Sequence, residues 1–196
     1  MSGAGSTITG AILAGGRGLR MGGLDKGLLE HRGRPLVEHV LEALRPQVGP
    51  LLIVANRNGA SYQRYGLPVH PDLIDGFQGP LAGLHTALSH ADTELVLCVP
   101  CDVPALPADL ARRMHSALEA AGADACAVHD GRRLHPVICL LRRSLAESLE
   151  QSLAADLRQV KAWLARQRFT VVDYADAAGC FENFNCPEQL GDRISR

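Results

Sequence analysis

A glycine-rich loop at residues 14–27 carries the side chains best suited to hold a phosphorylated ligand, and it directly follows a short apolar run. Glycine lets backbone N–H groups approach an anion closely. The cations of Arg20 and Lys26 can neutralise phosphate charge from one side. The alternative is a flexible surface loop with solvated charges, but flexibility alone does not need paired cations at the end of a strand. The loop therefore favours a phosphate-binding site.

Two common phosphate-binding motifs do not fit this loop. A Walker A motif needs Gly-Lys followed by Ser or Thr, whereas Lys26 lies between Asp25 and Gly27. A dinucleotide-binding fingerprint read from Gly16 would need Gly or Ala at the position of Met21. As a loop lysine, Lys26 is expected to be exposed, and its removal is expected to change stability by no more than about 0.5 kcal/mol.

An acidic residue follows another apolar run in the same way. Asp102 comes shortly after residues 94–99, in a loop framed by prolines. A carboxylate there would face phosphates held by the first loop, and Mg²⁺ prefers one or two carboxylates together with phosphate oxygens. A turn or cap aspartate is the alternative. Because Pro104 and Pro107 separate Asp102 from the next predicted helix, we expect Asp102 to bind the metal ion.

Short apolar runs alternate with segments of helical period, which predicts the elements that position these residues. Continuous apolar strands separated by helices indicate a three-layer α/β fold, with a Rossmann-like, mostly parallel sheet and helices on both faces. Ligands of such folds bind at the carboxyl ends of the strands. The expected strands are 8–13, 51–55, 94–99, 123–128, 137–141 and 170–172, and the expected helices are 35–44, 81–90, 107–121, 144–153 and 156–166.

The spacing of the loop residues matches a known group of enzymes. Gly15-Gly16-x-x-x-Arg20-Met21-Gly22-x-x-Lys26 resembles the signature of nucleotidyltransferases that join a nucleoside monophosphate to a phosphorylated acceptor. Within that group the chain resembles the molybdenum cofactor guanylyltransferases. The resemblance extends over nearly the whole chain, through the segments 55–57, 79–83, 100–104, 128–131, His135-Pro136 and 183–188.

The resemblance implies a fold of the nucleotidyltransferase type and transfer of GMP from GTP to molybdenum-loaded molybdopterin, with release of pyrophosphate. The acceptor phosphate would itself attack, so catalysis would depend on positioning and charge stabilisation rather than on a protein nucleophile. The catalytic groups implied are Arg20, Lys26 and Asp102, the last with Mg²⁺. The nucleotide-binding residues implied are Leu13, Ala14, Gly15, Gly16, Lys26, Asn56, Asp72, Gly83 and Asp102.

The resemblance also implies acceptor-side residues, namely His129, Asp130, Asn183 and Asn185. For several of the implied nucleotide-binding and acceptor-side residues, the residue type alone also allows a structural role. Asn56 and Asp72 could be turn residues. One of the two late asparagines could cap a short terminal helix.

Two rival functions remain open at this point. Pterin cytidylyltransferases typically carry Leu-Ala-Ala-Gly where this chain has Leu-Ala-Gly-Gly at residues 13–16. If this backbone lines the base pocket, a methyl group at Gly15 would crowd guanine before cytosine, and a positive φ there would add strain. The other rival is a non-catalytic nucleotide-binding or thiol-redox domain built on the CxxC of Cys98 and Cys101. No second CxxC completes a zinc site, and Cys98 ends an apolar run, which predicts a core residue.

Length and composition limit the remaining possibilities. The chain has 196 residues, which predicts one domain over 1–196 with a flexible N-terminus at about 1–7. Lys plus Arg number 20 against 21 acidic residues, which argues against nucleic acid or a membrane surface as partner. The N-terminus has no basic region typical of a signal peptide, so the expected location is cytoplasmic. The implied partners are GTP and the molybdenum-loaded pterin, together with pterin-delivering and molybdoenzyme-maturation proteins.

Overall fold

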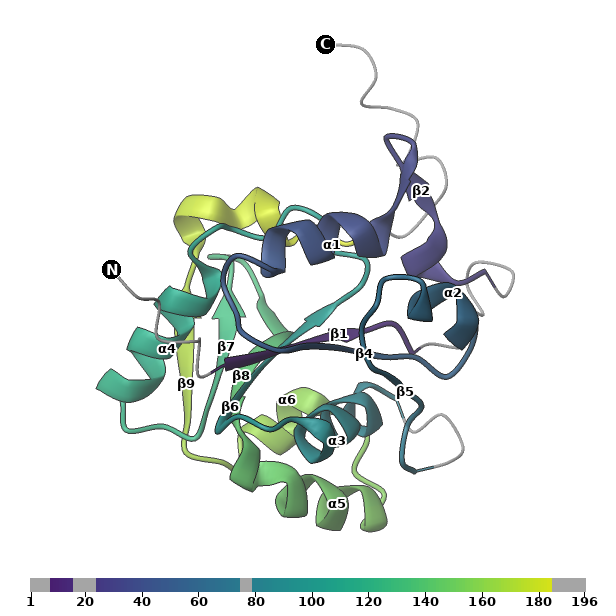
Figure 1. Cartoon of the computed structure of the whole chain (residues 1–196). Coiled ribbons are helices and arrows are strands. Elements are labelled where there is room, and N and C mark those ends of the chain that lie inside the picture. The colour runs from purple at the N-terminus through teal and green to yellow at the C-terminus, as the bar shows by residue number, and fades with distance from the viewer. Residues whose placement is uncertain (1–7, 16–23, 75–78, 185–196) are drawn as a thin grey trace.

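A seven-stranded sheet forms the centre of the computed structural model, which describes residues 8–15, 24–74 and 79–184 (Figure 1). The strand order is β5-β4-β1-β6-β8-β7-β9. These strands are β1 (Ile8–Leu13), β4 (Leu51–Val54), β5 (Val69–His70), β6 (Leu95–Pro100), β7 (Ala125–His129), β8 (Leu134–Arg142) and β9 (Phe169–Asp173). A separate antiparallel ribbon pairs β2 (Glu30–His31) with β3 (Arg34–Pro35).

The sheet is mostly parallel, as predicted. β1 runs parallel to β4 and β6, β4 to β5, and β7 to β9, whereas β8 is antiparallel to both β6 and β7. The reversal arises because residues 130–133 join β7 to β8 directly, without the helix that a parallel connection needs. Gly131 takes a φ of 84° in that turn, a conformation that glycine adopts without strain.

Helices cover both faces of the sheet, which confirms the predicted three layers. α1 (Leu36–Leu44) and α4 (Leu110–Ala120) lie on one face (Figure 1). The other face carries α3 (Pro80–His90), α5 (Ala146–Ala154) and α6 (Val160–Leu164). The short α2 (Gly59–Gln63) lies beyond the carboxyl ends of β1 and β4. Among the helices of the described residues, none is long and apolar enough to span a bilayer.

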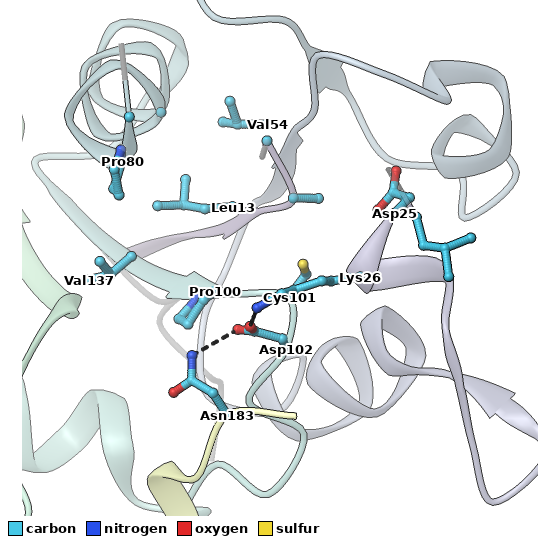
Figure 2. Close-up of a pocket in the computed structure, with 15 residues that line it drawn as sticks. Leu13, Asp25, Lys26, Val54, Pro80, Pro100, Cys101, Asp102, Val137 and Asn183 are labelled. Carbon is cyan, nitrogen blue, oxygen red and sulfur yellow. Dashed lines mark hydrogen bonds and ion pairs between the residues drawn. The ribbon is translucent and has the colours of Figure 1, made fainter. Parts of the chain in front are cut away.

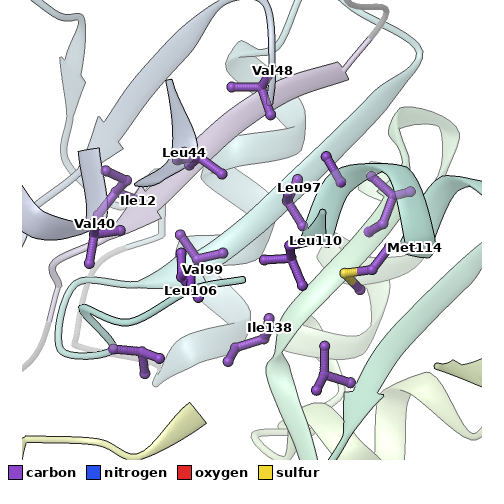
Figure 3. Close-up of a cluster of buried hydrophobic side chains, with 14 of the residues drawn as sticks. Ile12, Val40, Leu44, Val48, Leu97, Val99, Leu106, Leu110, Met114 and Ile138 are labelled. Carbon is purple, nitrogen blue, oxygen red and sulfur yellow. The ribbon is translucent and has the colours of Figure 1, made fainter. Parts of the chain in front are cut away.

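Each face of the sheet has its own hydrophobic cluster. Figure 3 shows the cluster under α1 and α4, where Ile12 and Val99 of the sheet meet Leu44 and Leu110 of the helices. The opposite cluster is built around the fully buried Trp163 of α6 and apolar residues of α3 and α5. Because successive strand residues face opposite sides, the apolar strands supply both clusters at once.

The two cysteines of the CxxC belong to different clusters. Cys98 packs in the cluster under α3, and Cys101 packs in the cluster under α1. Both are buried, and burial raises the pKa of the Cys101 thiol, so the reactive thiolate is disfavoured. Side chains on opposite sides of a sheet cannot converge on one metal ion or form one disulfide. The geometry therefore disfavours the thiol-redox alternative.

Several element ends differ from the prediction for local reasons. The helix expected over 156–166 is confined to α6, because Asp156 takes a φ of 60° just after α5 and interrupts the helical path. The helix expected from Pro107 begins at Leu110, whose N–H first bonds the Pro107 carbonyl in a turn. β5, α2 and the β2–β3 ribbon were not predicted, since segments of two to five residues are too short to show a period.

Candidate functional site

A cavity of about 310 Å³ opens at the carboxyl edge of the sheet (Figure 2). It lies where β1 ends, between its neighbours β4 and β6. After β1, the strand order continues through β4 and β5 on one side and through β6, β8, β7 and β9 on the other. Such switch points are the usual ligand sites of doubly wound folds. The cavity is lined by Leu13, Ala14, Gly15, Leu24, Asp25, Lys26, Val54, Gly79, Pro80, Gly83, Pro100, Cys101, Asp102, Val137 and Asn183.

Most of the predicted site residues that the structure describes meet at this cavity. Those that line it are Leu13, Ala14, Gly15, Lys26, Gly83, Asp102 and Asn183. Asn56 and Asp72 lie directly behind the lining, next to Gly15 and Gly83 respectively. Gly16, Arg20 and Asn185 lie outside the described residues, as do residues 1–7 of the predicted N-terminal tail.

Asp102 is held between a cation and an amide. The Nζ of Lys26 lies 3.0 Å from Oδ2 of Asp102, and Nδ2 of Asn183 donates to Oδ1 at 3.3 Å (Figure 2). Asp102 is only 6% exposed. The N–H of Phe184 also donates to the Asp102 carbonyl at 3.0 Å. These contacts join three distant parts of the chain at one sheet edge and give a buried carboxylate the cationic partner it needs.

The donor set around Asp102 suits one class of metal ion. Among residues 8–15, 24–74 and 79–184, no three His, Cys, Asp or Glu side chains gather closely enough to hold a metal by themselves. Mg²⁺ does not require such a cage, because it binds through one or two carboxylates while water and substrate phosphates complete its shell. The single carboxylate of Asp102 therefore fits a magnesium ion that is shared with a phosphorylated ligand.

A polar pair lies behind the glycines of the cavity wall. Nδ2 of Asn56 donates to Oδ2 of Asp72 at 2.6 Å, and the N–H of Asp72 donates to Oδ1 of Asn56 at 2.7 Å. Oδ1 of Asp72 is buried and has no hydrogen-bond partner among the residues that the structure describes. Burial raises the pKa of this carboxyl, while the Asn56 bond opposes that shift. A Cβ built on Gly83 would lie 3.9 Å from this oxygen. A buried acceptor without a partner, next to the cavity lining, is suited to a ligand N–H.

The backbone of Gly15 decides whether a positive φ would add strain to a substitution there. It does not take a positive φ, so that source of strain is absent. A Cβ built there would lie 3.2 Å from Nδ2 of Asn56 and 3.9 Å from the carbonyl oxygen of Val54. An added methyl group would therefore press first on the Asn56 side chain. Crowding of a bound base, the effect expected from the sequence, would come second.

A second cavity of about 190 Å³ adjoins the first, and the two share Pro100, Val137 and Asn183. Its other lining residues are Arg133, Leu134, His135, Pro136 and Ile138. Arg133 was not among the site residues predicted from the sequence. A cation close to the His135-Pro136 pair could have indicated a binding role. The shared wall means that ligands in the two cavities would approach each other near Asn183.

Neither His129 nor Asp130 lines these two cavities. Nδ1 of His129 accepts from the N–H of Gly131 at 3.1 Å, within the hairpin turn. Asp130 is buried, and its carboxylate accepts from the N–H groups of Arg132 at 2.8 Å and Arg133 at 2.7 Å. These two residues shape the turn of the hairpin, and the second cavity is lined by later residues of the same hairpin, from Arg133 to Ile138.

The hairpin also fixes His135. Its Nε2 lies 2.7 Å from Oδ2 of Asp130, and this hydrogen bond is the main reason that the pKa of Asp130 falls well below its usual range. Since the carboxylate only accepts, the contact orients the imidazole with its Nε2 proton toward Asp130. Asp130 therefore holds in place Arg133 and His135, two of the residues that line the second cavity.

Comparison with known proteins gives a consistent result. Residues 10–171 match the family model described as a MobA-like NTP transferase domain. A molybdenum cofactor guanylyltransferase from Shewanella pealeana is 44% identical over 191 residues, which cover 96% of each chain. Among solved structures, molybdopterin-guanine dinucleotide biosynthesis protein A from Archaeoglobus fulgidus is 25% identical, with a TM-score of 0.77 over 93% of this chain and 94% of that one.

A more distant structure shares the fold alone. It is a protein of Mycobacterium tuberculosis H37Rv, solved as a complex with manganese, and it is 19% identical to this chain. Its TM-score is 0.62, and the match covers 87% of this chain and 90% of that one.

Proposed function

The chain belongs to the family of molybdenum cofactor guanylyltransferases, and from that premise we propose how its site transfers GMP from GTP to molybdenum-loaded molybdopterin. It is a nucleotidyltransferase of molybdenum cofactor biosynthesis. An oxygen of the acceptor's terminal phosphate forms a bond to the α-phosphorus of GTP. The bond from that phosphorus to the bridging oxygen breaks, and pyrophosphate leaves. The products are molybdopterin guanine dinucleotide and pyrophosphate.

The observation that carries this assignment is the contact between Lys26 and Asp102 at the switch-point cavity. A transfer of this kind needs cationic stabilisation of the triphosphate and a carboxylate for the metal, close together at the transferred phosphate. Lys26 would bind the triphosphate and the departing pyrophosphate. The amino end of α3, at Gly79 and Pro80, brings the positive end of a helix dipole to the same cavity.

We assign Mg²⁺ to Asp102 on the chemistry of its donor set. The manganese in the distant Mycobacterium tuberculosis structure supports a divalent ion in a protein of this fold. When bound, the ion would supply Lewis-acid stabilisation of negative charge at the transferred phosphate. Asn183, which bonds the second carboxylate oxygen, would orient Asp102 for that role.

For the base, we propose that Asp72 accepts a hydrogen bond from guanine. Guanine presents adjacent N–H donors on its pairing edge, and Oδ1 of Asp72 is a buried acceptor with no partner within residues 8–15, 24–74 and 79–184. Asn56 would hold the carboxylate in position through the two hydrogen bonds that join this pair. A ligand that lacks the matching donor would leave this acceptor unsatisfied, which is a strong basis for discrimination.

For the acceptor, we propose the second cavity. Arg133 offers a guanidinium suited to phosphate, and His135 is oriented by Asp130. Asn183 would contribute to both subsites, because it lines both cavities. Family membership also leads us to infer a cytoplasmic location and exchange of the pterin with delivery and maturation proteins.

A donor screen tests the proposed function. Melting temperature would be measured with GTP, CTP and ATP in the presence of Mg²⁺, and pyrophosphate release would be measured with and without the molybdenum-loaded pterin. We expect GTP to raise the melting temperature most, since selective binding stabilises the native state. Pyrophosphate release should require both GTP and the pterin. A preference for CTP would instead establish the cytidylyltransferase alternative.

Gly15→Ala is expected to weaken GTP use more than CTP use. The methyl group would press on Asn56, only 3.2 Å away, and disturb its 2.6 Å bond to Asp72. A loss of about 1–3 kcal/mol in base discrimination is the expected size for an effect of this kind. The measurement is the ratio of kcat/KM values for GTP and CTP. Gly179→Ala is the matched control, because an added Cβ there meets nothing within 4 Å. An unchanged ratio in Gly15→Ala would contradict this account of base selection.

A further inference from the structure

A hydrogen-bond cluster that is buried only at its Tyr62 end joins α2 and the residue before it to the residue that precedes Lys26. The hydroxyl of Tyr62 donates to Oδ1 of Asp25 at 2.6 Å, and Nδ2 of Asn58 donates to Oδ2 at 2.9 Å. The N–H of Gly27 also donates to Oδ1, at 3.2 Å. Three donors thus converge on one carboxylate, which we call the Asp25 cluster. It borders the proposed nucleotide cavity, since Asp25 is itself part of the lining.

The local sequence explains why α2 can present two donors together. Asn58 takes a φ of 52° immediately before the helix, a conformation that asparagine tolerates better than most residues. Tyr62 follows four residues later and therefore faces the same side of the helix. The Tyr62 ring is fully buried in the cluster under α1. Burial also raises the pKa of its hydroxyl, which keeps it a donor at neutral pH.

The residue after Lys26 is constrained as tightly as the one before it. A Cβ built on Gly27 would lie 2.5 Å from the Tyr62 hydroxyl oxygen and 3.3 Å from Sγ of Cys101. Only glycine fits this space without displacing the hydroxyl. The backbone on both sides of Lys26 is therefore fixed against the same tyrosine, in the short 3-10 turn η2 (Lys26–Leu28), which Asp25 caps.

We propose that Tyr62 is a positioning residue for Lys26: through Asp25 and Gly27 it fixes the backbone from which the ammonium reaches the triphosphate. A lysine side chain has a flexible four-carbon stem, so its placement depends on a fixed backbone. Groups held in place before the ligand arrives lose less free energy on binding. This inference rests on the proposed role of Lys26 in binding GTP.

A purely structural role for Tyr62 makes a different prediction from a positioning role. The ring fills space in the core, and that contribution survives in Tyr62→Phe, which removes only the hydroxyl. If the hydroxyl merely stabilised the fold, its loss would lower the melting temperature without a specific effect on triphosphate. The matched control is Tyr65→Phe, because the Tyr65 hydroxyl donates to Glu38 at 3.1 Å and is not part of the Asp25 cluster.

The experiment is a double-mutant cycle of Tyr62 and Lys26 in which kcat/KM for GTP is measured. The assay is pyrophosphate release in the presence of Mg²⁺ and the molybdenum-loaded pterin. We expect Tyr62→Phe to lower kcat/KM by about tenfold, and Tyr65→Phe to change it by less than about twofold. In a Lys26→Ala background the same Tyr62→Phe change should lower kcat/KM by less than about twofold, because the ammonium group that Tyr62 positions is absent. Asn58→Gly is a second test, since glycine keeps the positive φ but removes the amide donor.

Two results would overturn the inference while leaving the proposed function intact. One is a kcat/KM for GTP of the Tyr62→Phe enzyme that equals that of Tyr65→Phe, while the wild-type protein transfers GMP from GTP. The other is an effect of Tyr62→Phe that is equally large with and without Lys26. If the wild-type protein itself shows no GTP-dependent pyrophosphate release, the proposed function fails instead. If Tyr62→Phe does not fold, the Asn58→Gly variant decides by the same cycle.

Discussion

Asp102→Asn is expected to lower GMP transfer by on the order of 10²–10³-fold, because metal-ion stabilisation of a transferring phosphate contributes several kcal/mol. An amide is a poorer ligand than a carboxylate for a hard cation such as Mg²⁺. The side chain keeps nearly the same size, so the fold should be retained. The measurement is steady-state pyrophosphate release over a Mg²⁺ titration, in which the variant should need more Mg²⁺ for half-maximal activity.

The same variant separates a metal-binding role from a general structural one. In EDTA, Asp102→Asn should bind GTP at least as tightly as the wild type, because it removes a negative charge from beside the triphosphate and releases Lys26 from its 3.0 Å ion pair. Asp124→Asn is the matched control. Asp124 also pairs with arginines, but it lies at the amino end of β7, on the opposite edge of the sheet. Full turnover of Asp102→Asn with an unchanged Mg²⁺ dependence would remove Asp102 from the metal site.

The meeting of Lys26 with Asp102 could be predicted because it follows from strand direction. β1 and β6 are continuous apolar runs, and parallel strands bring the residues that follow them to the same edge. No side-chain detail is needed for that step. The three layers were predictable for the same reason, since the alternation of apolar runs and helical periods extends along the chain.

The polar pairs behind the cavities could not be predicted in the same way. Asn56 meets Asp72 only because β5 pairs with β4, and β5 has two residues, too few to show a pattern. Asp130 turns its carboxylate inward to its own hairpin, which sequence spacing does not reveal. Such contacts depend on turn geometry and rotamers, whereas periodicity reports only which face a residue occupies.

The role proposed for Tyr62 could not be predicted from the sequence for a further reason. An aromatic residue among polar neighbours is ordinarily a core residue, and its ring is one here. Its hydroxyl, however, reaches Asp25 from a helix of only five residues. The hydroxyl proposed to act on Asp25 and the ring that fills the core belong to one side chain. Composition and spacing therefore indicate only the role of the ring.

Lys26→Ala is expected to weaken GTP binding by about 10- to 150-fold, since hydrogen bonds to charged groups are worth about 1.5–3 kcal/mol. The effect on GMP should be much smaller, because GMP lacks the two phosphates that the ammonium is proposed to bind. The measurement is the dissociation constant of each nucleotide by calorimetry. Lys161→Ala, an exposed lysine of α6, is the matched control.

The same substitution should also cost stability, contrary to the expectation from the sequence alone. The Lys26 side chain is 31% exposed and pairs with a carboxylate that is 8% exposed, so it is not a freely solvated loop lysine. Its removal leaves that buried carboxylate with the weaker Asn183 contact, at a cost of about 1–3 kcal/mol in the free energy of unfolding. Because a smaller folded fraction would weaken GTP and GMP binding equally, the ratio of their dissociation constants reports the loss of the ammonium itself. An unchanged ratio would mean that Lys26 stabilises the site without binding the triphosphate.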